Sequence, residues 1–240
     1  MTNLFLKRDR SRHPAALTPD YKSTRFRAPE KPLVMLEQSA AELTGPVFGH
    51  DLLGEKDNNL IENYAADGGE PIGPRLKIVG RVIDENGKPV PDCLIEIWQA
   101  NAGGRYRHKA ESYRAPLDPN FGGCGRTITA ADGSYEFITI RPAAYPFPNG
   151  PNSWRPAHIH FSLFGDAFAQ RLVTQMYFEG DPLIPLCPIV ETLPDQDAIR
   201  ALTALYDPEA TLPMDMQAYR FDIVLRGRSQ TLFENRMEGL

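Results

Sequence analysis

Two histidines separated by a single residue are the clearest chemical signal in this sequence. His158 and His160 stand in the run WRPAHIHF at residues 154–161. Side chains alternate between the two faces of a β-strand, so both imidazoles would share one face and the intervening Ile159 would occupy the other. Two imidazoles on one face can supply two ligands to a metal ion. A hydrogen-bonded or surface pair of histidines fits the same pattern, so this motif leaves both interpretations open.

Further ligands would have to come from elsewhere in the chain, because no Cys, Asp or Glu lies close to the histidine pair in a ligand-like pattern. Two tyrosines stand in loops that follow predicted strands: Tyr106 in the run ANAGGRYRH at 100–108 and Tyr145 in RPAAYPFP at 141–148. Glycine and proline set the backbone at both places, which suits side chains held in a preset orientation. From composition alone, an aromatic ring packed on its loop is the simpler interpretation of either tyrosine.

The elements that must position these residues are short strands separated by turns. The 22 prolines and 19 glycines among 240 residues favour many turns and few long helices. After residue 75, the apolar patterns predict strands at 76–83, 93–98, 135–140, 157–164, 171–178 and 219–225. This spacing predicts an all-β fold with a β-sandwich core. One helix is predicted to begin at Asp195, with Ile199, Leu202 and Leu205 on one face.

The first 75 residues differ from the rest and predict a long irregular arm. Prolines interrupt any regular element there, and only a short helix at 36–43 and a turn of helix at 58–64 are expected. An arm of this length with so little pattern usually wraps its own domain or a neighbour. We therefore expect residues 1–75 to pack on the core and on a partner subunit, and residues 76–240 to form the β-sandwich domain.

The bulk composition excludes several classes of function. A formal net charge of −5 gives no electrostatic footprint for nucleic acid, and no apolar run approaches the roughly 20 residues that span a bilayer. The apolar run at residues 4–6 is too short for the core of a signal peptide. Cys93, Cys124 and Cys187 are predicted to be buried small hydrophobic residues, not a disulfide framework, which fits a reducing cytoplasm.

Several longer runs together resemble the signature of the intradiol ring-cleaving dioxygenases. These runs are WQANAGGRYRH at 98–108, DPNFGG at 118–123, YP at 145–146, WRPAHIHF at 154–161, QMYFEGDPLIP at 175–185 and YRFDIVLRG at 219–227. The resemblance extends from about residue 14 to residue 235, nearly the whole chain. Within the family it is strongest to the iron-bearing subunit of the branch that cleaves protocatechuate (3,4-dihydroxybenzoate).

This resemblance implies a non-haem ferric site, Fe(III), with Tyr106, Tyr145, His158 and His160 as its ligands. Tyr106 and His158 correspond to the equatorial ligands, and Tyr145 and His160 to the axial ones. Tyr145 is the ligand that would leave the metal and take a proton from the substrate. The donor set is chemically consistent, because oxygen donors suit a hard cation and imidazole suits iron.

Other residues acquire roles only through the resemblance. Arg155 corresponds to a catalytic arginine that stabilises negative charge on the substrate, for which a fixed cation in a water-poor site is effective. The alternative interpretation of Arg155 is an ion pair at the protein surface. Gln175 corresponds to a position behind the metal ligands, and Ile189 corresponds to a position in the wall of the substrate pocket. Tyr21 and Arg27 lie in a segment that resembles the family's substrate-side arm.

One departure from the family pattern concerns the pocket wall. Relatives have Trp-Arg after the Tyr-Pro pair, whereas this chain has Phe147 and Pro148. Phe147 keeps an aromatic, substrate-binding wall with a smaller ring and no indole N–H, so the fine substrate specificity stays open. The remaining histidines, His13, His50 and His108, match no ligand position and are predicted to be structural or surface residues.

For the reaction, the resemblance implies an oxidoreductase that inserts both atoms of O2 into protocatechuate and cleaves the ring between the two hydroxylated carbons. The product would be 3-carboxy-cis,cis-muconate, in the β-ketoadipate pathway of aromatic catabolism. The implied partner is an α subunit of the same sandwich fold that lacks the iron ligands, in a hetero-oligomer.

Two alternatives remain. Catechol and hydroxyquinol 1,2-dioxygenases share the family signature but typically carry an N-terminal helical dimerisation region, which the proline-broken first 75 residues do not predict. A non-catalytic, transthyretin-like binding module is suggested by the run GRVIDENGKPVP at 80–91. Such a module has no need for Tyr106, Tyr145, His158 and His160 together.

Overall fold

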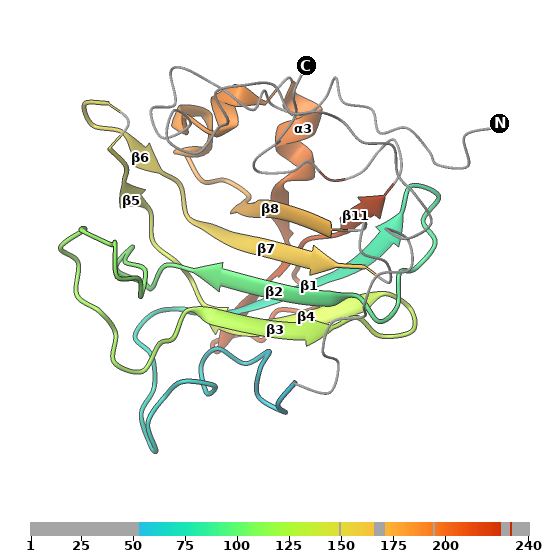
Figure 1. The fold of residues 1–240 in the computed structure, drawn as a ribbon, viewed down its shortest axis with the longest axis horizontal. Coiled ribbons are helices and arrows are strands. Elements are labelled where there is room, and N and C mark those ends of the chain that lie inside the picture. The colour runs from blue at the N-terminus through green and yellow to red at the C-terminus, as the bar shows by residue number, and fades with distance from the viewer. Residues whose placement is uncertain (1–52, 149, 166–170, 194, 227–230, 232–240) are drawn as a thin grey trace.

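The computed structural model describes residues 53–148, 150–165, 171–193, 195–226 and 231. The expected helix at 36–43, and Tyr21 and Arg27, lie outside this part of the chain. Within it the regular elements are mostly strands, with a few short helices, which confirms the all-β prediction (Figure 1). The elements are β1 (Arg75–Asp84), β2 (Leu94–Gln99), β3 (Cys124–Ile128), β4 (Ser134–Ile140), β5 (Tyr145–Pro146), β6 (Trp154–Arg155), β7 (His158–Phe164), β8 (Arg171–Phe178), η2 (Ile184–Leu186), η3 (Val190–Thr192), α3 (Gln196–Ala201), β9 (Thr203–Tyr206), β10 (Met216–Arg220) and β11 (Ile223–Arg226).

The strands form two packed layers that are joined along one side (Figure 1). In the first layer β3, β2, β7 and β8 pair in that order, all antiparallel. In the second layer β1 pairs with β4 on one side and with β10 and β11 on the other. β9 pairs with both β8 and β10, so the sheet passes from one layer to the next and comes close to a closed barrel. The predicted sandwich is confirmed, with its layers hydrogen-bonded into one sheet.

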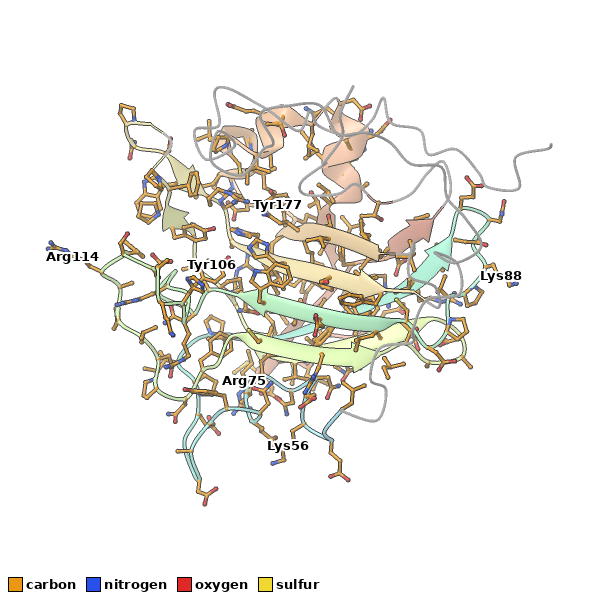
Figure 2. All side chains as sticks on the ribbon, viewed as in Figure 1. Lys56, Arg75, Lys88, Tyr106, Arg114 and Tyr177 are labelled. Atoms are coloured by element: carbon orange, nitrogen blue, oxygen red, sulfur yellow. The ribbon has the colours of Figure 1, made fainter. Side chains whose placement is uncertain are left out.

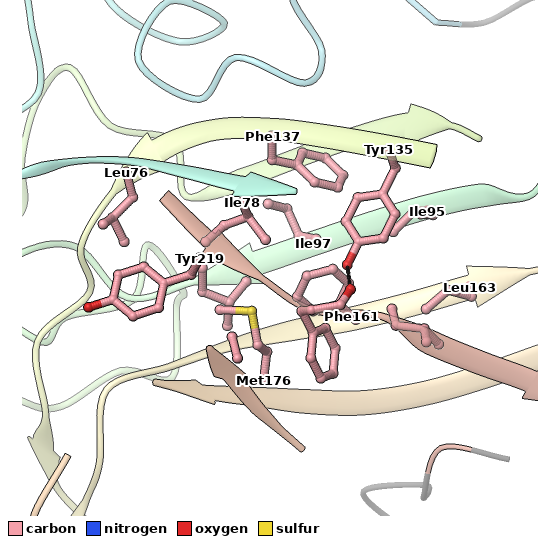
Figure 3. Close-up of a cluster of buried hydrophobic side chains, with 14 of the residues drawn as sticks. Leu76, Ile78, Ile95, Ile97, Tyr135, Phe137, Phe161, Leu163, Met176 and Tyr219 are labelled. Carbon is pink, nitrogen blue, oxygen red and sulfur yellow. Dashed lines mark hydrogen bonds between the residues drawn. The ribbon is translucent and has the colours of Figure 1, made fainter. Parts of the chain in front are cut away.

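The space between the layers holds the main hydrophobic core (Figure 3). Ile97 and Phe161 of the first layer and Ile78 and Phe137 of the second are each at most 1% exposed. The rings of Phe137 and Phe161 meet edge to face, with centroids 6.4 Å apart. Burying one such side chain contributes about 1.5–3 kcal/mol relative to leaving it in water. Because Phe161 points into the core, alternation along β7 turns the two histidines of this strand to its outer face.

Helix α3 is shorter than the sequence predicts. It begins as expected, since the Asp195 carboxylate accepts a hydrogen bond from the backbone N–H of Ala198 at 2.7 Å. It has only six residues, because Thr203 starts β9 and pairs with Tyr177 of β8. Leu205, assigned to the helix by its spacing, lies on β9 and is 57% exposed. This part of the prediction is wrong because strand pairing replaces the helix.

The strand predicted at 219–225 is two strands, β10 and β11, which both pair with β1 but are interrupted at Phe221. At the interruption the Tyr135 hydroxyl donates a hydrogen bond to the Phe221 carbonyl oxygen at 2.5 Å (Figure 3). Gly80 of β1 makes this close approach possible, since a Cβ there would lie 2.0 Å from the same oxygen. The predicted single strand is therefore corrected to two.

The described end of the arm packs against the sandwich. Residues 58–64 contain one helical turn, in which the backbone N–H of Asn63 donates to the carbonyl of Asn59 at 2.9 Å. Leu60 and Ile61 are buried and belong to the main core. Because this stretch shares the core with the strands, the domain boundary near residue 75 stays a prediction.

The cysteines are all free thiols. Cys93 and Cys187 are buried as predicted, whereas Cys124 is exposed. The prediction is wrong for Cys124 because it opens β3, the strand at the edge of the first layer. Among the described residues, no helix is long and apolar enough to cross a membrane.

Candidate metal centre

The four predicted ligand residues come together at one end of the first layer. β2 ends and β7 begins there, and β5 and β6 form a two-stranded ribbon beside them (Figure 1). Tyr106 lies in the loop after β2, Tyr145 opens β5, and His158 and His160 stand on the outer face of β7. Figure 2 shows Tyr106 at this end of the sheet. Strand pairing thus brings residues that are far apart in the sequence close together at this end of the sheet.

Their donor atoms lie close enough to share one metal ion. The Tyr106 hydroxyl oxygen is 3.3 Å from Nε2 of His158 and 3.1 Å from Nε2 of His160. The Tyr145 hydroxyl oxygen is also 3.3 Å from Nε2 of His158. Atoms bonded to one ion at about 2 Å are separated by roughly 3 Å. These spacings fit two phenol oxygens and two imidazole nitrogens arranged around a common point.

The hydrogen bonding of His158 suits a metal ligand. Its Nδ1 lies 2.7 Å from the carbonyl oxygen of Pro156, which accepts the ring N–H and leaves Nε2 with a lone pair. Two phenol oxygens approach this nitrogen, although one lone pair accepts only one good hydrogen bond. Burial, the charge of Arg155 and neighbouring His160 hold the pKa of His158 well below its usual value. The imidazole is therefore neutral at neutral pH, as metal binding requires.

Two touching loops hold the tyrosines. Asn101 accepts hydrogen bonds through its side-chain oxygen from two backbone N–H groups of the Tyr106 loop, at 2.9 and 3.0 Å. Gly104 has a φ of 79°, and a Cβ there would lie 2.6 Å from the carbonyl oxygen of Ala144. The loop of Tyr106 can therefore contact the loop of Tyr145 only because residue 104 is glycine.

Arg155 is buried next to the ligands and is only 2% exposed. It is the cross-strand neighbour of Tyr145 in the β5–β6 ribbon. Its guanidinium donates to the side-chain oxygen of Gln175, to the sulfur of Cys187 at 3.2 Å and to the hydroxyl of Tyr177 at 3.3 Å. The alternative of an ion pair at the surface is therefore wrong, because this cation lies inside the protein.

A cavity of about 1050 Å³ opens over the site. Tyr106, Tyr145 and His160 form part of its wall, and Phe147 contributes the aromatic surface that the sequence predicts. Other large side chains around it are Trp98, His108, Glu111, Tyr113 and Trp154. The space accommodates a substituted aromatic ring.

The remaining predicted residues are placed at different depths. Gln175 of β8 is the cross-strand neighbour of His160 and is 2% exposed. Ile189 packs against a second hydrophobic cluster around Tyr177 and is not one of the cavity-lining residues, so its role in the pocket wall stays a prediction. His108 is exposed on the cavity wall, as expected for a surface histidine.

Two residues at the site were not predicted as functional. Trp98 stacks on the ring of His160, and Tyr177 contacts Arg155 through its hydroxyl (Figure 2 labels Tyr177). Trp98 is the cross-strand partner of His160, and Tyr177 is the partner of His158. Cross-strand register would have identified both, but it depends on pairing between distant segments.

The donor set itself indicates the kind of ion that fits. Within the described part of the chain, no three His, Cys, Asp or Glu side chains are grouped so that they could hold a metal. A metal here would therefore need the two tyrosines together with the two histidines. Phenol oxygens with imidazole nitrogens suit a hard, highly charged cation such as Fe(III), whereas structural zinc prefers thiolates.

Comparison with known proteins gives consistent results along the chain. A family model described as Dioxygenase matches residues 43–227. A second, described as the N-terminal part of the protocatechuate 3,4-dioxygenase beta subunit, matches residues 6–39. The protocatechuate 3,4-dioxygenase beta chain of Burkholderia cepacia is 50% identical over 231 residues, covering 96% of this chain and 97% of that relative.

Two further comparisons, one of sequence and one of structure, point to the same family of dioxygenases. The protocatechuate 3,4-dioxygenase alpha chain of Pseudomonas putida is 29% identical over 84% of this chain and 98% of its own length. The crystal structure of 3-chlorocatechol 1,2-dioxygenase from Rhodococcus opacus 1CP superposes with a TM-score of 0.50 at 27% identity, covering 75% of this chain and 70% of that chain. The chain therefore belongs to the intradiol ring-cleaving dioxygenases, a family of oxidoreductases.

Proposed function

We propose that this chain is the iron-bearing subunit of an enzyme that cleaves protocatechuate to 3-carboxy-cis,cis-muconate. The observation that carries the proposal is the convergence of two phenol oxygens and two imidazole nitrogens, with contacts of 3.1–3.3 Å, at the edge of a large cavity. The substrate follows from the relative that is 50% identical over nearly the whole chain and is named for protocatechuate.

The family uses non-haem iron, and the ligands proposed here are Tyr106, Tyr145, His158 and His160. When bound, ferric iron supplies the positive charge that holds the deprotonated diol and activates its ring toward O2. The neutral imidazoles contribute no charge, so ionised tyrosines would balance much of the charge of the cation.

Tyr106 and Tyr145 would have different roles. The loop of Tyr106 is fastened by Asn101, so this tyrosine would remain in place throughout the reaction. Tyr145 opens a strand of only two residues and its ring lines the cavity, so its side chain has room to move when a diol enters. Its phenol oxygen would then accept one of the two protons that the diol loses. This step converts Tyr145 from a ligand into a proton acceptor.

Arg155 would act on the ring as negative charge develops there. Its guanidinium is already oriented by Gln175, Tyr177 and Cys187 and excluded from water. A preorganised cation in such a place costs no reorganisation at the moment of reaction and is worth several kcal/mol to a developing charge.

The partner would complete the substrate pocket. Among the described residues that line the cavity there is no lysine or arginine, and Glu111 is the one carboxylate. We infer that the cation facing the substrate carboxylate lies outside this lining, and Arg27 of the predicted substrate-side arm and a partner related to the alpha chain that this sequence resembles are the two candidates to supply it. Gel filtration of the co-expressed pair should give a mass well above that of one chain. A mass near a monomer would contradict the proposed partner.

The test of the substrate compares protocatechuate, catechol and hydroxyquinol with the co-purified pair, identifying products by mass and ultraviolet spectrum. We expect protocatechuate to have the highest kcat/KM and to give 3-carboxy-cis,cis-muconate. Faster cleavage of catechol or hydroxyquinol would assign the chain to that branch, a distinction for which Phe147 in the cavity wall is the relevant departure. An iron-loaded protein that cleaves none of the three would refute the proposal.

A further inference from the structure

Trp98 makes the best-defined ring contact at the metal centre. Its indole and the imidazole of His160 are stacked, with centroids 4.6 Å apart and planes only 3° from parallel. By comparison, the contact between the rings of His158 and His160 is close to perpendicular, at 74°. A parallel stack at this distance restricts rotation of the imidazole about its Cβ–Cγ bond, a torsion that is otherwise broad.

That torsion decides where the nitrogen of His160 points. The lone pair of Nε2 lies in the plane of the imidazole, so turning the ring turns the donor away from the ion. Nε2 of His160 lies 3.1 Å from the Tyr106 oxygen in the stacked orientation. For His158 the corresponding ring orientation is fixed by the carbonyl oxygen of Pro156, 2.7 Å from Nδ1. For His160 the stacked indole adds a contact over the whole face of the ring.

The backbone places Trp98 for this role. Trp98 on β2, His160 on β7 and Gln175 on β8 are paired in one row across three neighbouring strands. Paired residues in antiparallel strands share one face of the sheet, so the indole is held against the imidazole by the register itself. Trp98 also lines the cavity, so one ring both covers the imidazole face and forms part of the cavity wall.

We propose that Trp98 is a positioning residue that fixes the plane of His160 and thereby retains the metal. This inference rests on the proposed function, since it requires that His160 bind iron. Residues outside the ligand set that orient metal-bound histidines commonly change metal affinity by roughly 10- to 100-fold. The indole would act in this way through stacking.

The test measures the rate at which a chelator removes iron from the purified holoenzyme, followed by the loss of visible absorption. Trp98→Leu removes the flat ring and should speed iron loss by roughly 10- to 100-fold. Trp98→Phe keeps a smaller flat ring and should fall between that variant and the wild type. Trp154→Leu is the matched control, because Trp154 lies on β6 at the cavity, 37% exposed, with its indole N–H on Asn152. This control should lose iron at the wild-type rate.

The melting temperatures of the iron-free forms separate positioning from general destabilisation. The proposal is supported if Trp98→Leu loses iron faster than Trp154→Leu at a similar iron-free melting temperature. It is overturned if Trp98→Leu loses iron at the wild-type rate, or if the rates simply follow the melting temperatures. Should Trp98→Leu not fold, Trp98→Met, which also lacks the ring, carries the same expectation. A wild-type protein that binds no iron would instead overturn the proposed function, and this inference with it.

Discussion

Replacing Arg155 with methionine should remove most of the turnover while leaving the metal site filled. Arg155 is 2% exposed and donates to Gln175, Tyr177 and Cys187, but it contributes no donor atom to the metal centre. Methionine has a similar length and fills irregular space in a core. The substitution therefore removes the charge with little change in packing.

The expected magnitudes separate a catalytic effect from unfolding. Losing one preorganised electrostatic contact typically lowers kcat by about 10²–10³-fold, or roughly 2.7–4 kcal/mol. Losing hydrogen bonds to a charged group costs stability of about 1.5–3 kcal/mol, partly offset because a charge no longer has to be buried. Gln175 still accepts a hydrogen bond from Tyr177 at 2.9 Å. Since domains are stable by about 5–15 kcal/mol, the variant should remain folded.

The assay measures kcat and iron content in Arg155→Met and Arg155→Lys, and the pKa of His158 in the iron-free proteins by NMR titration. The lysine variant keeps the cation but not the planar fork that reaches both Gln175 and Cys187, so its kcat should be intermediate. Because Arg155 helps to lower the pKa of His158, that pKa should be higher in the iron-free methionine variant than in the iron-free wild type. A methionine variant with wild-type kcat would contradict a charge-stabilising role for Arg155, and one that is already free of iron at neutral pH would show that Arg155 is needed to keep the metal.

Other perturbations test the two remaining kinds of ligand, the buried imidazole and the packing of β1. Tyr145→Phe should keep its iron but bind the diol more slowly, with kcat/KM lower by about 10²–10⁴-fold in stopped-flow assays; unchanged binding would contradict a proton-accepting role. His160→Ala should lose its iron, and full iron with full activity would show that the ligand assignment is wrong. Because the pKa of His158 is lowered in the folded state, the iron-free protein should lose stability as pH falls below about 6.5, by up to ~1.4 kcal/mol per pH unit in urea denaturation, whereas a flat profile would contradict a buried neutral imidazole. Gly80→Ala, whose Cβ would lie 2.0 Å from the Phe221 carbonyl oxygen, should destabilise the fold by about 1–3 kcal/mol, and an unchanged unfolding midpoint would show that β1 can move.

Much of the fold could be predicted from local patterns, because strands that bury one face alternate in sequence. Strand β3 was not predicted, because it has few apolar residues and contains Gly125. A Cβ at Gly125 would lie 2.4 Å from a methyl group of Leu60, so the glycine is needed for packing against a segment some 65 positions earlier in the chain. Contacts between distant segments of this kind leave no mark in a local window.

The candidate site also contains residues that local patterns reveal and residues that they do not. The histidine pair could be recognised from strand periodicity, because β7 places both imidazoles on one face. The tyrosines stand in loops and could be assigned only through the family resemblance. Trp98 was missed because its role depends on register with His160, which pairing between β2 and β7 determines.

The most direct test of the proposed ferric site is the iron content of the purified chain together with its visible absorption spectrum. We expect about one ferric ion per chain and a broad visible band from phenolate bound to iron, which Tyr106→Phe should weaken and shift. Protein that is colourless and free of iron after expression in iron-replete medium with its partner, or a visible spectrum unchanged by Tyr106→Phe, would contradict a site built from two tyrosines and two histidines.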